Sequence, residues 1–243
     1  MPRSPFATPK GIEREYGSKL KKIAKNIFGI VNRFFDRESG SADRAVEKLT
    51  EYGEAISEWA KTSVEMVAKR MKANSEKDWK KVSKRMSRQA KIALQKKGSP
   101  EDAAQIWMNE QVDLITSLPR EAAERAQKIA FDAVVKGERY ETIQKEIRNL
   151  GEITDNRAKL IARTEVARAN AMINKAKAQS IGVTRYIWRT MEDESVRSKH
   201  RALNGLTFEY ANPPEIPGEG RHGPGEFCNC RCYAEPVIPL EEE

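Results

Sequence analysis

The change in hydrophobic period at Gly182 constrains the fold of this 243-residue chain more than any other feature. Before that residue, apolar side chains recur every three or four positions, as at Tyr16, Leu20 and Ile23, which is typical of an amphipathic helix. After it, the segment VTRYIWRT alternates β-branched and aromatic residues, which indicates a strand. We therefore predict a mainly α protein with an elongated helical N-terminal part and a small α+β C-terminal domain that carries a short β-sheet.

Proline and glycine divide the helical part into segments. Residues 98–100, Gly-Ser-Pro, combine a helix stop, a cap and a first-turn proline, and the helix that follows is expected to end near Leu118. Pro119 then opens an alanine-rich stretch. We therefore predict two domains, a helical N-terminal region with a basic helix over residues 1–118 and a C-terminal domain over residues 119–243.

Glycines mark the expected helix ends of the C-terminal part. We predict that one helix ends at Gly137, that a short helix ends at Gly151, and that a long helix capped by Thr154 or Asp155 follows.

The β part of the sequence follows Gly182. After the first strand, an Asn204-Gly205 turn is expected to lead into a second strand. Residues 212–227 contain four prolines and four glycines, which predicts a long irregular loop before a final strand in residues 228–240.

The net charge of +8 favours an acidic partner. Between Met66 and Lys97 there are twelve Lys or Arg residues and only two acidic residues, fewer than a purely solvated helix would use for ion pairs. We predict sequence-independent binding of double-stranded DNA, with an acidic protein surface or a solvated helix face as alternatives. The candidate contacts are Lys69, Arg70, Lys77, Lys80, Lys81, Lys84, Arg85, Arg88 and Lys91.

The sequence contains no apolar run of about 18 residues, so we predict no membrane span. The first ten residues, MPRSPFATPK, lack the apolar stretch of a secretory signal, so we expect synthesis in the cytosol, where thiols stay reduced. Because the cysteine count is three, an odd number, we do not expect a disulfide framework.

All three cysteines lie in the segment EFCNCRCYAEP, at alternate positions. In an extended segment, Cys228, Cys230 and Cys232 would point to the same face. Together with His200 and His222 they could form a structural zinc site. Two alternatives stay open: the cysteines pack as small buried hydrophobes, or one acts as a nucleophile with a histidine base.

Glu192, Asp193 and Glu194 form an acidic group near His200. Such a group could bind a divalent cation, as in a nuclease, or could be a surface turn. We find no phosphate loop, H-E-x-x-H, G-x-S-x-G or EF-hand pattern.

From Pro119 onward the sequence resembles the phage Mu F-like family of minor head proteins, also called phage head morphogenesis proteins. The resemblance is carried by three features in order: the IARTE helix, a tryptophan followed by Asp-x-x-Val-Arg-x-x-His-x-x-Leu-x-Gly, and a Cys-Arg-Cys ending. The residues that match these features are Ala162 to Glu165, then Trp188, Asp193, Val196, Arg197, His200, Leu203 and Gly205, and finally Cys230 to Cys232.

This resemblance implies a structural protein of a tailed phage or prophage, located in the head interior of the virion and in the host cytoplasm during assembly. It also implies association with the portal protein or capsid interior, DNA contact and no enzymatic activity. Arg163, Glu165, Asp193 and Arg197 are expected to pair with polar groups of the β region. Family members often carry a histidine shortly before Cys-Arg-Cys, whereas this chain has residues 227–229, Phe-Cys-Asn.

The alternative is an enzyme built on the same domain, either a metal-dependent nuclease that uses His200 and Asp193 or a toxin. A nuclease is expected to need more converging acids and histidines than this sequence supplies. A toxin is expected to need a further catalytic domain.

Overall fold

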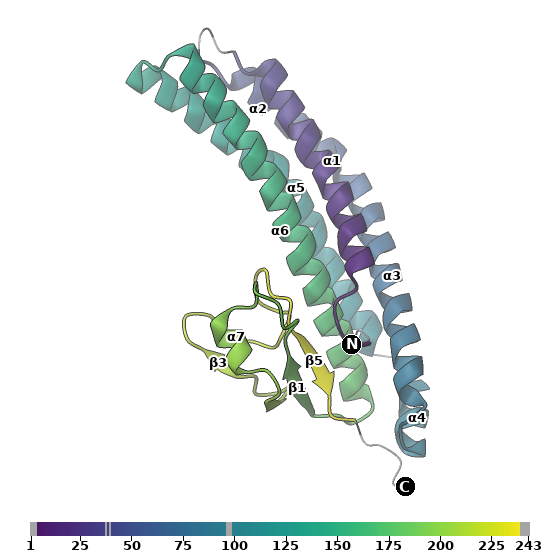
Figure 1. Cartoon of the computed structure of the whole chain (residues 1–243). Helices are drawn as coiled ribbons and strands as arrows, with labels where there is room; N and C mark the ends of the chain where they lie inside the picture. The colour runs from purple at the N-terminus through teal and green to yellow at the C-terminus, as the bar shows by residue number, and fades with distance from the viewer. Residues whose placement is uncertain (1–3, 37, 39, 96–98, 239–243) are drawn as a thin grey trace. The chain divides into compact units, whose positions relative to one another are not determined.

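The computed structural model describes residues 4–36, 38, 40–95 and 99–238 (Figure 1). The helices in these residues are α1 (Lys10–Phe34), α2 (Asp43–Ala55), α3 (Ser57–Ser83), α4 (Arg88–Gln95), α5 (Ser99–Lys136), α6 (Tyr140–Ser180) and α7 (Ser198–Ala202). The strands are β1 (Arg185–Arg189), β2 (Thr207–Glu209), β3 (Glu215–Ile216), β4 (Gly220–Arg221) and β5 (Tyr233–Pro236). The predicted class is confirmed, because helices dominate up to Ser180 and a small antiparallel sheet follows. Among the described residues, no helix combines the length and apolar character of a membrane span.

The chain forms two compact units, each assembled from separate stretches of sequence. We call Arg14–Glu65 with Asn109–Ala162 the helical unit, and Met1–Glu13, Met66–Met108 and Arg163–Glu243 the sheet unit. Both units draw residues from both sides of position 119, and the division into domains at that position stays a prediction.

The core of the helical unit confirms the periodicity of the first helix. Tyr16, Leu20, Ile27 and Val31 lie on one face of α1 and are completely buried. Burying each such side chain contributes about 1.5–3 kcal/mol, so this face supplies much of the unit's stability. The Tyr16 hydroxyl lies 3.2 Å from Oε1 of Gln111 on α5, which satisfies its buried polar group.

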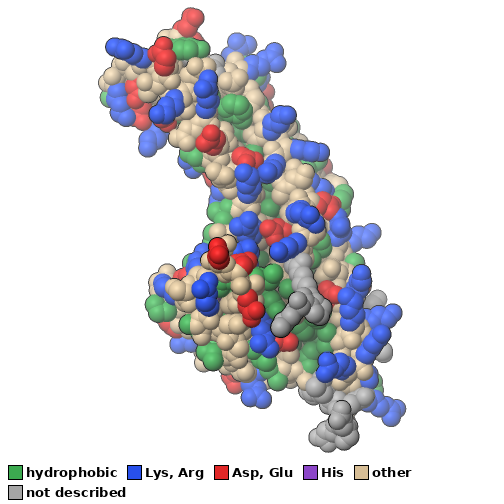
Figure 2. All heavy atoms as spheres, viewed as in Figure 1, with side chains coloured by type: hydrophobic (Ala, Val, Ile, Leu, Met, Phe, Trp, Pro, Cys, Tyr) green, Lys and Arg blue, Asp and Glu red, His purple; other side chains and the backbone are tan. Residues whose placement is uncertain are grey.

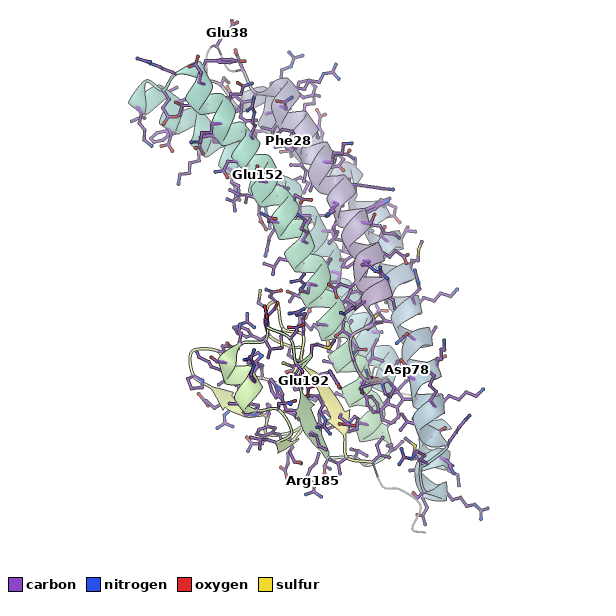
Figure 3. The ribbon with its side chains drawn as sticks, viewed as in Figure 1. Phe28, Glu38, Asp78, Glu152, Arg185 and Glu192 are labelled. Carbon is purple, nitrogen blue, oxygen red and sulfur yellow. The ribbon has the colours of Figure 1, made fainter. Side chains whose placement is uncertain are left out.

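The predicted helix end at Gly151 is wrong, because α6 runs through this residue without interruption. A Cβ atom at Gly151 would lie 2.6 Å from the Cδ2 atom of Phe28, closer than real Cβ contacts. Figure 3 labels Phe28 on α1 and Glu152, the next residue after Gly151, on α6. The glycine therefore serves the close approach of α1 and α6. The Thr154 hydroxyl donates to the Leu150 carbonyl at 2.8 Å inside the helix, so it is not a cap.

The predicted helix boundary at Pro119 is also wrong, because α5 contains this proline in its interior. Proline has no N–H to donate to Ile115, four residues earlier, and normally disfavours such a position. Leu118 and Ala122 on either side are 1% exposed, so buried packing holds the helix together across the proline. The predicted stop at Gly98 lies outside the described residues.

The basic segment is not one helix. α3 ends at Ser83, and α4 begins at Arg88. Met86, in the turn between them, is completely buried in the core of the sheet unit, and the Ser87 hydroxyl accepts a hydrogen bond from the Ala90 N–H at 3.4 Å. A buried anchor and a serine cap therefore end one helix and start the next.

The sheet has the strand order β2-β1-β5, and both pairs are antiparallel. Tyr186 and Trp188 on β1 face the core, whereas Arg185 is exposed, which confirms the predicted alternation. The predicted turn before β2 is confirmed as well: Gly205 has φ +85, and its N–H donates to the Trp188 carbonyl at 2.8 Å. Gly137 and Gly182 likewise follow helix ends with φ of +60 and +79.

The cysteines do not lie in the final strand, contrary to the prediction. β5 begins at Tyr233, one residue after Cys232. Asn229 has φ +57, a left-handed conformation that interrupts the extended chain after Cys228. Cys228 is exposed as a result, while Cys230 and Cys232 are buried. The predicted common face therefore holds for two cysteines and not for three.

Candidate metal centre

A short helix brings His200 to the core of the sheet unit. α7 follows the loop after β1, and the His200 side chain is only 2% exposed. Its ring packs edge-on against the Trp188 ring, with 5.4 Å between ring centroids. This packing fixes the plane of the imidazole.

Two cysteines face this imidazole. The Sγ atoms of Cys230 and Cys232 lie 3.5 Å and 3.6 Å from Nδ1 of His200. A turn places them there, since the Cys230 N–H donates to the Phe227 carbonyl at 3.0 Å. The ligand atoms of these three buried residues all lie within 4.8 Å of one another, so they could hold a metal ion.

The other side of the imidazole is held by Glu219. Its Oε2 atom lies 2.8 Å from Nε2 of His200 and 3.3 Å from Nε2 of His222. His222 also stacks on Phe227, with 5.0 Å between ring centroids. His200, Glu219 and His222 form a second group that could hold a metal ion.

The two groups share His200, and its two nitrogen atoms have different roles. When Nε2–H donates to Glu219, Nδ1 presents its lone pair to the two sulfur atoms. Histidines that bind metals are commonly oriented in this way by a carboxylate on the other nitrogen. The geometry therefore assigns Cys230, Cys232 and Nδ1 of His200 as candidate ligands and Glu219 as the group that orients them.

The protonation of the centre favours one thiolate. The hydrogen bond from Cys232, and after it the hydrogen bond from His200, lower the pKa of Cys230 to about 4 against the effect of burial. The hydrogen bonds with Cys230 raise the pKa of both partners, Cys232 and His200. Burial acts to raise the pKa of Glu219, but the hydrogen bond and charge of His200, together with Arg197 and His222, outweigh it and the pKa is lowered. A thiolate is the form of cysteine that binds metals.

Of the five predicted metal residues, the structure brings together His200, Cys230 and Cys232. His222 lies beside His200, with 5.7 Å between ring centroids, but belongs to the second group with Glu219. The exposed Cys228 lies outside both groups, with its sulfur 4.0 Å from the Thr164 hydroxyl. The sequence analysis missed Glu219. Its only signal was an acidic residue three positions before His222 in an otherwise glycine- and proline-rich loop.

Arginines tie the segments of the centre together. Arg197 donates to the Cys228 carbonyl at 2.8 Å and lies over the Phe227 ring at 5.2 Å. Arg163 on α6 donates to the Asn229 side chain at 3.1 Å, in the loop before β5. Glu165 forms an ion pair at 3.7 Å with Arg168 of its own helix.

Asp193, which the nuclease alternative combines with His200, contacts other residues. Asp193 pairs with Arg231 at 2.6 Å and accepts from the Ser195 N–H at 3.1 Å. His200 instead contacts Glu219 and the cysteines. The two residues that this alternative combines are thus engaged by different partners.

The predicted DNA contacts occupy α3, the following turn and α4. Figure 2 shows Lys and Arg side chains gathered along these elements. Lys91 is half-buried and the other eight candidate residues are exposed. Arg70, Lys77, Lys81 and Arg85 line a groove of the sheet unit, whereas Lys69, Lys80, Lys84 and Arg88 do not.

Comparison with known proteins supports the resemblance for part of the chain. Residues 124–235 match a family model described as phage Mu protein F like protein. This part of the chain is similar to the Mu F-like family. The resemblance inferred from the sequence is confirmed, and the candidate ligands Cys230, Cys232 and His200 all lie within the Mu F-like region. The predicted start of the C-terminal domain, residue 119, precedes the matched residues by a short distance.

Two curated relatives share part of the chain. A protein of Haemophilus influenzae, described as uncharacterized, is 34% identical over 132 residues, which are 54% of this chain and 29% of the relative. A protein of Methanocaldococcus jannaschii, also described as uncharacterized, is 32% identical over 110 residues, which are 45% of this chain and 16% of the relative. The chain therefore spans less than a third of either relative. No solved structure matches it.

Proposed function

We propose that this chain is a minor head protein of a tailed phage or prophage that associates with the portal region inside the capsid and contacts the packaged DNA. The match of residues 124–235 to the Mu F-like family supports a role in phage head morphogenesis. The observation that carries DNA contact is the set of eight exposed basic side chains on α3, the following turn and α4. We propose a structural role and no catalysis.

Charge density explains why DNA is the favoured partner of this segment. Asp78 and Glu76 are its acidic residues, and Asp78 is engaged by Lys81 at 3.2 Å and by Asn74 at 2.9 Å. The segment therefore has twelve basic residues against two acidic ones, which gives it a high density of positive charge. Phosphates attract such a surface through counterion release, without reading base sequence.

The test is a salt titration of binding to duplex DNA of two unrelated sequences. About six phosphate contacts would give a slope of about −5 in log affinity against log salt concentration. Replacing Lys80, Lys81, Lys84, Arg85 and Arg88 with Gln should weaken binding to both sequences alike and reduce the slope.

A matched control removes the same charge elsewhere. Arg125, Lys128, Arg139, Lys145 and Arg148 are exposed residues of the helical unit, and their replacement with Gln should leave most of the affinity intact. Equal losses in both variants would mean that net charge alone attracts DNA. Absence of binding at low salt would reject the DNA contact.

Location in the virion is tested separately. Mass spectrometry of purified heads and proheads should detect this chain in fewer copies than the main capsid protein. Its absence from both particles would reject the structural role, whatever the outcome of the DNA experiment.

We also propose that the metal centre holds zinc as a structural element. Zn–S and Zn–N bonds of about 2.3 Å and 2.0–2.1 Å at tetrahedral angles place sulfur and nitrogen about 3.5–3.6 Å apart. The observed separations between Nδ1 of His200 and the two Sγ atoms are 3.5 Å and 3.6 Å. When bound, zinc would hold the chain before β5 to α7. Two thiolates and an imidazole are the ligands that zinc prefers.

A further inference from the structure

The sheet unit contains an open groove of about 1110 Å³. Its walls come from the N-terminal arm before and at the start of α1, from α3 with the turn after it, and from β5 with the two residues that follow. These segments all belong to the sheet unit. The volume is that of a site for a ligand or a short peptide segment.

One wall of the groove is basic. Arg70, Lys77, Lys81 and Arg85 follow spacings of seven, four and four residues, which place them on one side of α3 and its turn. Lys10 faces the groove from the start of α1.

The two acidic residues of the groove are already engaged. Asp78, labelled in Figure 3, accepts hydrogen bonds from Asn74 and Lys81, and Glu235 pairs with Arg189. The groove therefore presents an excess of positive charge to whatever enters it.

The remaining lining is apolar. Phe6, Val82, Pro236 and Val237 line the groove, and Phe6 is fixed by an edge-on contact with Trp79 at 5.4 Å between ring centroids. Val237 is 38% exposed, so apolar surface is available to an incoming group. Duplex DNA makes mainly polar contacts through its phosphates and would leave this surface unused.

We propose that this groove binds an extended acidic segment of a partner protein, with carboxylates on Lys77, Lys81 and Arg85 and apolar side chains against Val82 and Val237. An extended segment presents alternate residues to opposite sides, which suits a groove with one basic and one apolar wall. This binding does not depend on the proposed DNA contact, although Lys77, Lys81 and Arg85 belong to both surfaces.

The test measures binding of three probes to the full chain: a labelled ten-residue peptide of alternating Glu and Leu, the same peptide with Ser in place of Leu, and a 20-base-pair duplex. The variant Lys77→Gln with Arg85→Gln removes two charges from the groove. The control Lys80→Gln with Lys84→Gln removes two charges from the same segment, at positions that do not line the groove.

We expect the groove variant to lose at least tenfold in affinity for the Glu/Leu peptide and the control variant less than twofold. The Glu/Ser peptide should bind at least tenfold more weakly than the Glu/Leu peptide. Equal losses in both variants, or equal affinity for both peptides, would overturn the proposal and leave non-specific charge attraction. Tighter binding of the duplex than of the peptide, lost in the groove variant alone, would make the groove a nucleic-acid site instead.

The chain's own acidic end, Glu241 to Glu243, is the remaining alternative occupant. Replacing these three residues with Gln should change the affinity for the Glu/Leu peptide less than twofold. A tenfold gain would mean that an intramolecular segment competes for the groove, and the proposal of a partner protein would be overturned.

Discussion

Glu219 and His200 form a buried pair in which Oε2 lies 2.8 Å from Nε2 and both side chains are at least nine-tenths buried. The carboxylate orients the imidazole so that Nδ1 faces the two cysteines. Carboxylates that hydrogen-bond a metal-binding histidine in this way typically contribute 10–100-fold to metal affinity.

We therefore predict that Glu219→Ala lowers zinc affinity by at least tenfold, measured by competition with a chromogenic chelator. Glu219→Gln should retain part of the affinity, because the amide oxygen can still accept the Nε2 proton. Glu215→Ala is the matched control, since Glu215 lies in the same loop and pairs at 3.1 Å with the exposed Arg221. If Glu219→Ala and Glu215→Ala behave alike, Glu219 does not position His200.

Removal of the thiols tests the centre itself. Protein purified without chelator or affinity metal should contain about one zinc per chain, and a strong chelator should lower its Tm. Cys230→Ser or Cys232→Ser should abolish zinc binding and cost more than the 1–2 kcal/mol expected for a buried packing defect. Cys228→Ser should change neither property, because this residue is exposed.

Elemental analysis decides whether Cys230 and Cys232 bind zinc or only pack as buried side chains. Less than about 0.2 zinc per wild-type chain, with a Tm that chelation does not change, would reject the metal centre. Cys230 and Cys232 would then act by packing and by hydrogen bonding to His200.

The contact of Gly151 with Phe28 predicts that replacement by alanine changes the free energy of unfolding in opposite directions at Gly151 and Gly29. Gly151→Ala should lower the free energy of unfolding by about 1–3 kcal/mol, because the added Cβ displaces the Phe28 ring. Gly29→Ala should raise it by about 0.5–1 kcal/mol, because a Cβ there meets nothing within 4 Å and alanine favours the helix. Denaturant unfolding measures both. In a Phe28→Ala background, Gly151→Ala should become stabilising, and a loss there would contradict the steric explanation.

Two buried tyrosines predict a loss of stability at alkaline pH. The hydroxyls of Tyr186 and Tyr210 have no hydrogen-bond partner among the described residues, and burial raises the pKa of both. Because the folded-state pKa lies above the unfolded value of about 10, the folded state keeps protons that the unfolded state releases, and stability falls as pH rises above 10. We expect a loss of about 1 kcal/mol per tyrosine between pH 9 and 11.

Replacing both tyrosines with Phe should flatten this pH dependence and raise the free energy of unfolding at pH 8, since an unsatisfied buried hydroxyl costs about 1–3 kcal/mol. Tyr140→Phe, at a residue that is 49% exposed, is the control. A double variant with an unchanged alkaline profile would show that both hydroxyls are satisfied in solution.

Local signals predicted most of the fold. The face of α1, the alternation of β1 and the left-handed glycines at positions 137, 182 and 205 follow from spacing and backbone preference alone. The helix boundaries predicted at Gly151 and Pro119 are wrong, although glycine and proline both break isolated helices. In this protein, Phe28 packs against Gly151, and buried neighbours hold the helix around Pro119, so tertiary packing outweighs local preference.

The candidate site was predicted only in part, for a related reason. Alternation along the chain identified Cys230 and Cys232, and His200 was a candidate because it is one of only two histidines. The left-handed conformation of Asn229 turns the chain so that Cys228 lies outside the metal centre, and the loop between β2 and β5 places Glu219 beside His200. Neither effect has a local sequence signal, because both depend on how an irregular loop returns to the sheet.

The interleaved construction of the sheet unit determines when it can fold during synthesis. Trp79 donates from Nε1 to the side chain of Asn174 at 2.8 Å, 95 residues later in the chain, and the Phe6 carbonyl accepts from Asn170, 164 residues later. Ribosomes add about 5–20 residues per second, so Trp79 waits roughly 5–20 s before its partner has been translated. Throughout that interval the aromatic side chains of this core are open to chaperones and to neighbouring nascent chains.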